Sequence, residues 1–500
     1  MKLEQARVDF SLLQKKISAY KHATALIYHD GETAAPPDTL DNRTRALQVL
    51  NDELVRLSIG PETMELLHYL EENQYDLTVN ERRAVEYMLK DYNRRKSIPV
   101  DEYVRYEQLL IEAQDAWHKA RENNDFEDIR PFLEDIFNTS RHFALLDRPN
   151  EDPYLYWLAN YEEGLSVETC DQIFEMIKNG IPELVKEITE KSKVEIKKVD
   201  GDFPVFAQEE LALYILELFG VNMNRVGLAF AEHSFTTQLG SHFDERIGIK
   251  YTKRDFTSSM YSVMHSAGHI LCDMGQADNL AYTALDGTAS MVILESQGYF
   301  YENIVGKSRE FIEHIYPELQ ELFPNYMKDV TAEDFYKAVN RVEPGLIRVD
   351  SDELTFMLHT MIRYELEKAM LRQDLPVKEL PDAWRDMYKK YLGLDVTNHV
   401  EGILQDIHWP FGAIGYFPTY VIGNSFGFSI ANKMRETIDI EACVSEGDFS
   451  KINEWSHEKI WKHGGIYTSS EIMKKFVGAS PDNTAHIEYL KNKYKEIYKL

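Results

Sequence analysis

The sequence has few cysteines, few basic residues for its size and no long apolar run. Its three cysteines, Cys170, Cys272 and Cys443, are scattered and include no C-x-x-C pair, which indicates reduced thiols rather than a disulfide framework. Lysine and arginine total 55 against 84 acidic residues, and the net charge of −29 argues against binding nucleic acid or an anionic membrane surface. No stretch of 18 or more apolar residues occurs, and the charged N-terminus is not that of a signal peptide. We therefore expect a cytoplasmic protein.

The chain also lacks internal repeats, low-complexity tracts and Gly/Ser-rich linkers. Its 500 residues, of which 44% are hydrophobic, are enough for a large core. We expect a single domain over residues 1–500, in which residues 1 to about 200 form a helical wall or lid. Residues from about 201 to 500 would then form the body that carries the site.

Apolar residues recur at steps of three and four along most of the chain, which predicts a mostly helical fold. One such helix is predicted from Val167 to Lys178, with Ser166 as its N-cap and Gly180 as its stop. Pro182 would then lie in the first turn of the following helix. Further helices are predicted over 79–146 with breaks at Pro99 and Pro131, and over 255–275, 287–305, 349–371, 416–435 and 450–463.

One region departs from this helical pattern. Residues Val226 to Tyr251 contain the runs GLAFAEHSFTTQL and ERIGIKY, which favour short β-strands around a Gly-Ser turn. A small sheet is therefore expected directly before the helix at 255–275. The segment Ala34-Ala35-Pro36-Pro37 predicts a turn between the first two helices.

The helix predicted at 255–275 carries the run Met264-His265-Ser266-Ala267-Gly268-His269. Residues four apart lie on one face of a helix, so His265 and His269 can reach one metal ion. The run is the zinc-peptidase pattern His-Glu-x-x-His with Ser266 in place of the glutamate that acts as general base. The chain has 16 histidines, so a pair at this spacing also arises by chance. By itself the pair leaves a metal site and two hydrogen-bonded helix histidines as equal alternatives.

Glu295, in a predicted helix downstream, could complete a His₂Glu site with a fourth zinc position left open, as catalytic sites require. On spacing alone, a solvent-exposed helix glutamate is the simpler interpretation, because 84 acidic residues make a nearby one unremarkable. Cys272 follows His269 by three residues, and a small buried side chain explains it better than a metal ligand does.

Short motifs follow one another along nearly the whole chain. They are Asp30-Gly31-Glu32-Thr33-Ala34-Ala35-Pro36, Tyr161-Glu162-Glu163-Gly164, His233-Ser234-Phe235, Asp244-Glu245-Arg246-Ile247-Gly248, His265 to His269, Leu294-Glu295-Ser296, Ile347-Arg348-Val349-Asp350-Ser351-Asp352, Gly402-Ile403-Leu404-Gln405-Asp406-Ile407-His408-Trp409, Gly415 to Tyr420, and Lys462 to Thr468. In this order they resemble the motifs of the carboxypeptidase Taq family of zinc metallocarboxypeptidases. The chain departs from the family's pattern at several positions: His29 for tryptophan, Ser234 for proline, Gly248 for threonine, Ser266 for glutamate, Leu294 for histidine and Ser351 for alanine.

The resemblance implies a mostly α-helical metallopeptidase fold with a long central groove and a small β-sheet next to the metal-binding helix. It implies a homodimer that releases single residues from the C-termini of peptides bound in the groove. It also implies one zinc ion per chain, with cobalt or manganese as possible substitutes. The implied ligands are His265, His269 and Glu295.

Further roles carry over from the family to matching positions. Arg348 is implied as the clamp of the peptide's terminal carboxylate, a task that suits a planar guanidinium, with a structural salt bridge to Asp352 as the alternative. His408 is implied to steady the oxyanion or the leaving group, with a core histidine held by Asp406 as the alternative. The remaining implied substrate-binding residues are Tyr416, Tyr420, His233 and Arg246.

Ser266 cannot replace a general base, because its hydroxyl is not basic near pH 7 and its side chain is short. General acid–base assistance is worth roughly 10²–10⁴-fold in rate. We expect strongly impaired peptidase activity unless Asp244, Asp286 or His408 acts as the base instead. The family's threonine is lost at Gly248 and its histidine at Leu294, which also suggests relaxed selection on the catalytic centre. The alternatives are a non-catalytic pseudo-peptidase that binds metal and peptide, and a purely structural helical protein.

Overall fold

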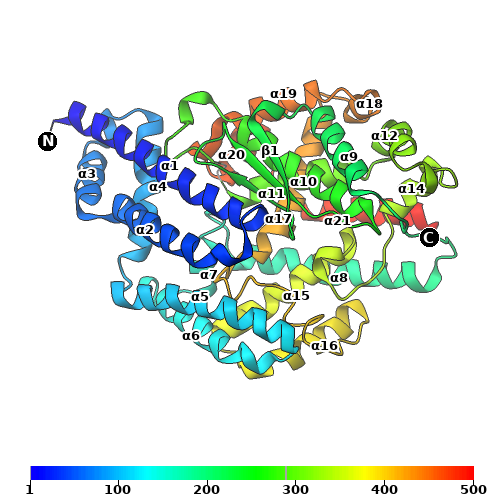
Figure 1. Ribbon diagram of the computed structural model, residues 1–500, viewed down its shortest axis with the longest axis horizontal. Helices are drawn as coiled ribbons and strands as arrows, with labels where there is room; N and C mark the ends of the chain where they lie inside the picture. Colours follow the sequence, from blue (N-terminus) through cyan, green and yellow to red (C-terminus); the bar gives the residue numbers. More distant parts are fainter. Residues whose placement is uncertain (1, 288–289) are drawn as a thin grey trace. The chain divides into compact units, whose positions relative to one another are not determined.

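The computed structural model describes residues 2–287 and 290–500 and is mostly helical, with a small three-stranded sheet (Figure 1). This confirms the fold class expected from the sequence. The chain divides into two compact units, each assembled from three segments. Unit 1 contains Met1–Asn93, Val199–Val339 and Ile430–Ser480, and unit 2 contains Arg94–Lys198, Asn340–Ser429 and Pro481–Leu500. The single domain over residues 1–500, with its expected division near residue 200, stays a prediction.

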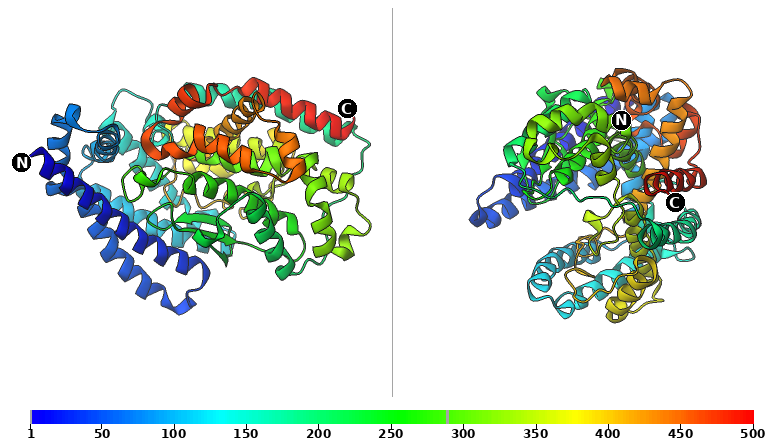
Figure 2. Two further views of the ribbon diagram at one scale, coloured as in Figure 1. Left: turned by 90° about the horizontal axis from the view of Figure 1, so that it is seen from above. Right: turned by 90° about the vertical axis from the view of Figure 1, so that its right-hand side faces the viewer.

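Unit 1 holds the sheet and most of the helices. Helices α1 and α2 pack side by side as a hairpin, and Figure 2 shows this pair from two further directions. Among the described residues, no helix combines the length and the apolar character that crossing a bilayer requires. The helices of this unit are α1 (Leu3–Thr33), α2 (Leu40–Ile59), α3 (Pro61–Glu72), α4 (Val79–Arg95), α9 (Val205–Leu218), α10 (Phe256–Met274), α11 (Met291–Tyr299), α12 (Arg309–Leu322), α13 (Pro324–Met327), α14 (Ala332–Val339), α18 (Ile440–Glu446), α19 (Ser450–Lys459) and α20 (Ser469–Ile472).

Unit 2 is built from helices, and the helices predicted over 349–371 and 416–435 are present with small differences in their ends. α5 begins after Pro99, and α6 carries Pro131 in its first turn. The helices of unit 2 are α5 (Val100–Asn123), α6 (Arg130–Asp147), α7 (Pro153–Leu158), α8 (Val167–Lys191), α15 (Glu353–Arg372), α16 (Leu380–Leu392) and α21 (Asn483–Tyr498), together with the first part of α17 (Phe417–Arg435), whose residues from Ile430 on belong to unit 1.

Helix α8 corrects one expectation from the sequence. Ser166 caps it as expected, since its side chain accepts a hydrogen bond from the backbone N–H of Thr169. The helix does not stop at Gly180, however, and it continues through Pro182. Gly180 is buried against α21, where an added Cβ would lie 3.2 Å from Ile487. The glycine therefore serves close helix packing, and the long buried face of α8 outweighs the local cost of a proline inside it.

The sheet lies beside α10, as the sequence predicts. Its strands β1 (Val226–Phe230), β2 (Phe235–Gln238) and β3 (Glu245–Ile249) have the order β1-β3-β2, with β1 parallel and β2 antiparallel to β3. Ile247 and Ile249 of β3 are fully buried, and α10 packs against β2 and β3. The sheet therefore forms one wall along the helix that carries the two histidines.

Two glycines let α10 and α11 approach closely. A Cβ on Gly268 of α10 would overlap the backbone carbonyl of Gln297, and a Cβ on Gly298 of α11 would lie 2.5 Å from the ring of His265. The helices thus meet backbone to backbone at the level of the histidines. This contact brings α11, and with it Glu295, next to the His265–His269 face of α10.

Candidate metal centre

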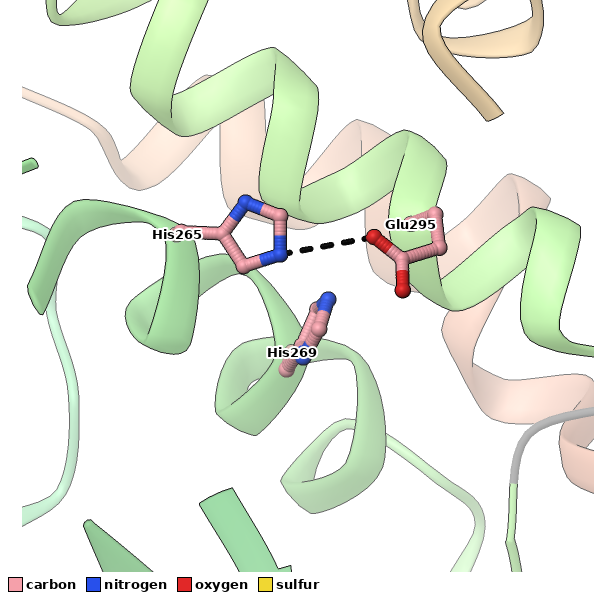
Figure 3. A group of neighbouring side chains, drawn as sticks. All are labelled: His265, His269 and Glu295. Atoms are coloured by element: carbon pink, nitrogen blue, oxygen red, sulfur yellow. Dashed lines mark ion pairs between the residues drawn. The ribbon is translucent and has the colours of Figure 1, made fainter. Parts of the chain in front are cut away.

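Three side chains from α10 and α11 converge on one point (Figure 3). One ligand atom from each of His265, His269 and Glu295 lies within 4.8 Å of the other two, and His265 Nε2 lies 3.5 Å from Glu295 Oε2. Two ligands about 2.1 Å from one tetrahedral ion lie roughly 3.4 Å apart, so this pair is spaced to share an ion. Within residues 2–287 and 290–500, no second group of His, Cys, Asp or Glu ligands gathers in this way.

The donor set and its burial fit a divalent metal ion. His269 is buried, and its Nε2 has no hydrogen-bond partner. An unsatisfied buried nitrogen costs free energy, and coordination would remove that cost. Two imidazole nitrogens and one carboxylate oxygen are the ligands of a His₂Glu zinc site. Cys272 is a buried thiol, in agreement with its expected packing role.

The two imidazoles have opposite electrostatic settings. Burial lowers the pKa of His265, but hydrogen bonds to Glu295 and Glu302 outweigh it and raise this pKa to about 10. Burial, followed by the nearby charge of His265, lowers the pKa of His269 well below its ordinary value. In the metal-free protein, His265 is therefore an imidazolium between two carboxylates, whereas His269 is neutral.

Ser266 is buried on α10, directly after the first histidine. Asp286, one of the acids considered as a stand-in base, is engaged elsewhere. Although burial opposes it, the hydrogen bond from His242 and its other donors hold the pKa of Asp286 below its ordinary value. Its two oxygens accept hydrogen bonds from Gln238 Nε2 (3.1 Å), His242 Nδ1 (2.8 Å), the His242 backbone N–H (3.2 Å) and the Tyr282 backbone N–H (2.8 Å). This carboxylate ties the loop after α10 to the sheet.

Comparison with known proteins decides the family. A family model described as carboxypeptidase Taq (M32) metallopeptidase matches residues 9–494. Carboxypeptidase 1 of Bacillus subtilis is 34% identical over 502 residues, which cover 100% of both chains. The chain belongs to the carboxypeptidase Taq family.

Other members of the family agree in sequence and in fold. Thermostable carboxypeptidase 1 of Pyrococcus furiosus is 33% identical, and the match covers 96% of each chain. The crystal structure of an M32 carboxypeptidase from Deinococcus radiodurans has a TM-score of 0.95 at 29% identity, over 99% of this chain and 100% of that chain. The family consists of metallopeptidases, so the triad of His265, His269 and Glu295 is where a divalent ion is expected.

Two positions that depart from the family pattern lie against the same ring in unit 1. Gly248 of β3 pairs with Phe235 of β2, and a Cβ at Gly248 would overlap the Phe235 ring. His29 of α1, which replaces the family's tryptophan, makes an edge contact with the same ring at 5.8 Å. A threonine at position 248 would therefore collide with the Phe235 ring where it lies in this structure.

Two of the predicted substrate-binding residues, His233 and Arg246, lie at or near the sheet. His233 is exposed in the turn between β1 and β2. Arg246 of β3 forms an ion pair with Asp244 at 2.5 Å. Asp244, another acid considered as a substitute base, is therefore paired with a guanidinium group.

In unit 2, Arg348 pairs with a different acid from the one expected. Its Nε and Nη2 both donate to Asp406 Oδ1, at 3.0 and 2.9 Å. Asp352 instead caps α15, accepting hydrogen bonds from the backbone N–H groups of Leu354 and Thr355. The suggested Arg348–Asp352 salt bridge is therefore wrong, because the N-cap role uses the Asp352 carboxylate.

His408 is half-buried near the same acid but is not hydrogen-bonded to it. Its Nδ1 lies 3.9 Å from Asp406 Oδ1 and has no hydrogen-bond partner. Burial lowers the pKa of His408 to about 4, and Arg348 adds to this effect against the attraction of Asp406. His408 is thus neutral near pH 7. Tyr416 contacts its ring at 5.7 Å, and the Tyr416 and Tyr420 rings lie 5.1 Å apart.

Two residues beside the triad were not anticipated from the sequence. Glu302 accepts a hydrogen bond from His265 Nδ1 at 2.9 Å, and Thr236 Oγ1 lies 3.4 Å from His269 Nδ1. A signal for Glu302 was present, since it follows Glu295 by seven residues, which is two helical turns. Thr236 offered no signal, because its contact depends on how β2 packs against α10.

Proposed function

We propose that this chain is a zinc metallocarboxypeptidase-like protein whose hydrolysis of peptides is strongly impaired by Ser266. The observation that carries the proposal is a converged ligand triad, His265, His269 and Glu295, directly beside a serine at the general-base position. Family membership supports the same reaction class, the release of C-terminal residues from peptides. We further propose a homodimer in the cytoplasm with peptides as its ligands.

A bound zinc ion would polarise the peptide carbonyl and lower the pKa of a bound water to about 7. The protein must then move a proton to the departing amine, which leaves poorly as an anion. A glutamate at position 266 could carry that proton, whereas the Ser266 hydroxyl is too weak a base to accept it. Asp244 and Asp286 are each held by other groups, which disfavours them as substitutes.

Arg348 is proposed as the group that binds the terminal carboxylate of the peptide. Its guanidinium is held by Asp406, and the rings of Phe356, Phe417 and Tyr420 surround it at 5.8, 5.7 and 5.5 Å. These contacts fix its orientation before a ligand arrives, which lowers the entropy cost of binding. His408, neutral near pH 7, is proposed to donate a hydrogen bond to the oxyanion or to the leaving group.

The second candidate function is a pseudo-peptidase that binds metal and peptide without turnover. Ser266 is the observation that favours it, and the two candidates differ only in the residual rate. A purely structural role is disfavoured, since it predicts that the three ligand side chains point apart.

The test compares zinc-loaded protein with its Ser266→Glu and Ser266→Ala variants on short peptides, measuring zinc content and released C-terminal residues. We expect Ser266→Glu to raise the rate by roughly 10²–10⁴-fold and Ser266→Ala to leave it unchanged. Full activity of the unmodified protein would overturn the impairment. Tight peptide binding with no turnover would establish the pseudo-peptidase, and absence of zinc after loading would remove the metal site.

A further inference from the structure

Helix α11 and the π-helical turn that follows it form a cradle around the His265 ring, made by Glu295, Gly298 and Glu302. Glu295 Oε2 lies 3.5 Å from Nε2, and Glu302 Oε2 lies 2.9 Å from Nδ1. Between them, the ring lies so close to Gly298 that an added Cβ would be 2.5 Å from its Cε1. Each ring nitrogen therefore lies next to one carboxylate, and the glycine leaves room for the ring itself.

The local structure explains how one helix supplies both carboxylates. Glu295 and Glu302 follow each other by seven residues and lie on one face, since both carboxylates contact the same His265 ring. Glu302 belongs to a π-helical turn, Phe300–Val305, that continues α11. Such turns cost stability in an α-helix and are frequently found at functional sites. Lys307 lies 4.0 Å from Glu302 and balances part of its charge.

The two ligand histidines are held unequally. His265 is partly exposed, with 31% of its side chain accessible, and its Nδ1 partner is a carboxylate. His269 is buried, and its Nδ1 partner is the neutral hydroxyl of Thr236 at the longer distance of 3.4 Å. Packing fixes the orientation of the buried ring, whereas the partly exposed ring depends on its hydrogen bond.

We propose that Glu302 is a positioning residue for the metal ligand His265 and that Gly298 provides the clearance its ring needs. When Nδ1–H donates to Glu302, Nε2 is left with its lone pair directed to the centre of the triad. The carboxylate also makes the imidazole more basic, so that its Nε2 donates an electron pair to a metal ion more strongly. This inference rests on the proposed function, because it assumes that the triad binds zinc.

The test measures zinc affinity by competition with a chelator, so it does not depend on activity. Glu302→Leu removes the acceptor at similar volume, and we expect zinc to bind roughly 10–100-fold more weakly. Glu302→Gln keeps an amide oxygen that can accept from Nδ1, so its loss should be smaller. The matched control is Glu321→Gln, which removes an exposed carboxylate of α12. Unchanged affinity in Glu302→Leu, while the unmodified protein binds zinc, would overturn the inference and leave the proposed function standing.

Absence of zinc binding by the unmodified protein would overturn the proposed function and this inference with it. If Glu302→Leu does not fold, ¹⁵N NMR of the histidine rings in Glu302→Gln keeps the inference testable. We expect the His265 signal to report a proton fixed on Nδ1 in zinc-loaded unmodified protein and a weakened Nδ1 hydrogen bond in the variant. Identical signals would contradict the role of Glu302.

Gly298→Ala tests the other half of the cradle. Its methyl group would collide with the His265 ring, so we expect zinc affinity to fall by about 10-fold or more. Gly345→Ala is the matched control, since a Cβ there meets nothing closer than 4.0 Å. Equal affinities of the two variants would show that the ring does not need this clearance.

Discussion

The triad in unit 1 and the arginine cluster in unit 2 are built with opposite charge. Around His265, two carboxylates, Glu295 and Glu302, face imidazoles that are neutral once a metal is bound, so the cluster favours a cation. Around Asp406, the two buried guanidinium groups of Arg348 and Arg363 outnumber one carboxylate, so that cluster favours an anion. A protein that binds a metal ion and a peptide carboxylate needs one cluster of each kind.

The two clusters also differ in how far their sequences depart from the family motifs. In unit 2 the motif from Gly402 to Trp409 is intact. In unit 1 the three ligands are kept, but Ser266 and Leu294 stand immediately next to two of them. Under the proposed function, binding groups are therefore retained in both units, and the departure falls on proton transfer. Substitutions in each unit can separate these properties.

The largest effect is expected from His269→Ala in unit 1. Removing a direct ligand should weaken zinc binding by more than the roughly 10–100-fold cost of losing an outer-shell partner. Zinc content after loading and dialysis measures this, with His68→Ala, an exposed histidine of α3, as control. Stoichiometric zinc in His269→Ala would mean that the triad is not the metal site.

Asp406→Asn should have the largest effect in unit 2. Although burial opposes it, Arg348 and Arg363 hold the pKa of Asp406 far below its ordinary value, so the carboxylate is charged at every working pH. Its loss leaves two buried guanidinium groups without their charged partner, at a cost of about 3–5 kcal/mol in the free energy of unfolding. Urea unfolding followed by tryptophan fluorescence measures this cost.

The control for this change is Asp395→Asn, which removes an exposed partner of Lys389 and should cost no more than about 1 kcal/mol. If the two variants unfold at the same urea concentration, the Asp406 cluster does not stabilise unit 2. Zinc content should be the same in both, since neither residue is a ligand.

The sequence predicted local features well and long-range pairings poorly. The helix with His265 and His269, the small sheet before it and the Ser166 cap each depend on residues within a few positions of one another. The partner of Arg348 was misjudged because Asp352 is near in sequence, whereas the true partner, Asp406, lies 58 residues away. A capping role for Asp352 was readable from its place before a helix, and that role competes with a salt bridge.

Glu302 and Thr236 show the same limit at the metal centre. Each acts through a histidine on another element, so its role depends on how α10 packs against α11 and β2. Gly180 shows the limit for glycine, because it allows a close approach of two helices and does not end one. Local rules identify a glycine as special, but only the packed structure shows what approaches it.

A third effect concerns pH in unit 2. Burial raises the pKa of Glu367 to about 7, against hydrogen bonds from Tyr154, Gly415 and Trp409. Because this folded-state pKa exceeds the ordinary value of 4.5, the folded protein binds the proton more tightly than the unfolded chain. The stabilisation is complete below about pH 4.5 and is lost as the pH rises through about 7.

Glu367→Gln removes this titration, so the variant should show a flatter dependence of unfolding free energy on pH between about 4.5 and 7. The total difference should be on the order of 2–3 kcal/mol. Glu122→Gln, an exposed change on α5, should keep the slope of the unmodified protein. Parallel slopes in the protein and in Glu367→Gln would contradict a raised pKa at this site.

The smallest effect is expected from Gly248→Thr, which restores the family's residue in unit 1. The added side chain would overlap the Phe235 ring, and overpacking of this kind costs about 1–3 kcal/mol. If Gly248 and His29 changed together as a packing pair around Phe235, Phe235→Leu should relieve the strain. The double variant would then be more stable than the sum of the single changes implies, by about 0.5 kcal/mol or more. Strict additivity would show that the glycine is unrelated to Phe235, and the loss of threonine would again count with Ser266 as a change at the catalytic centre.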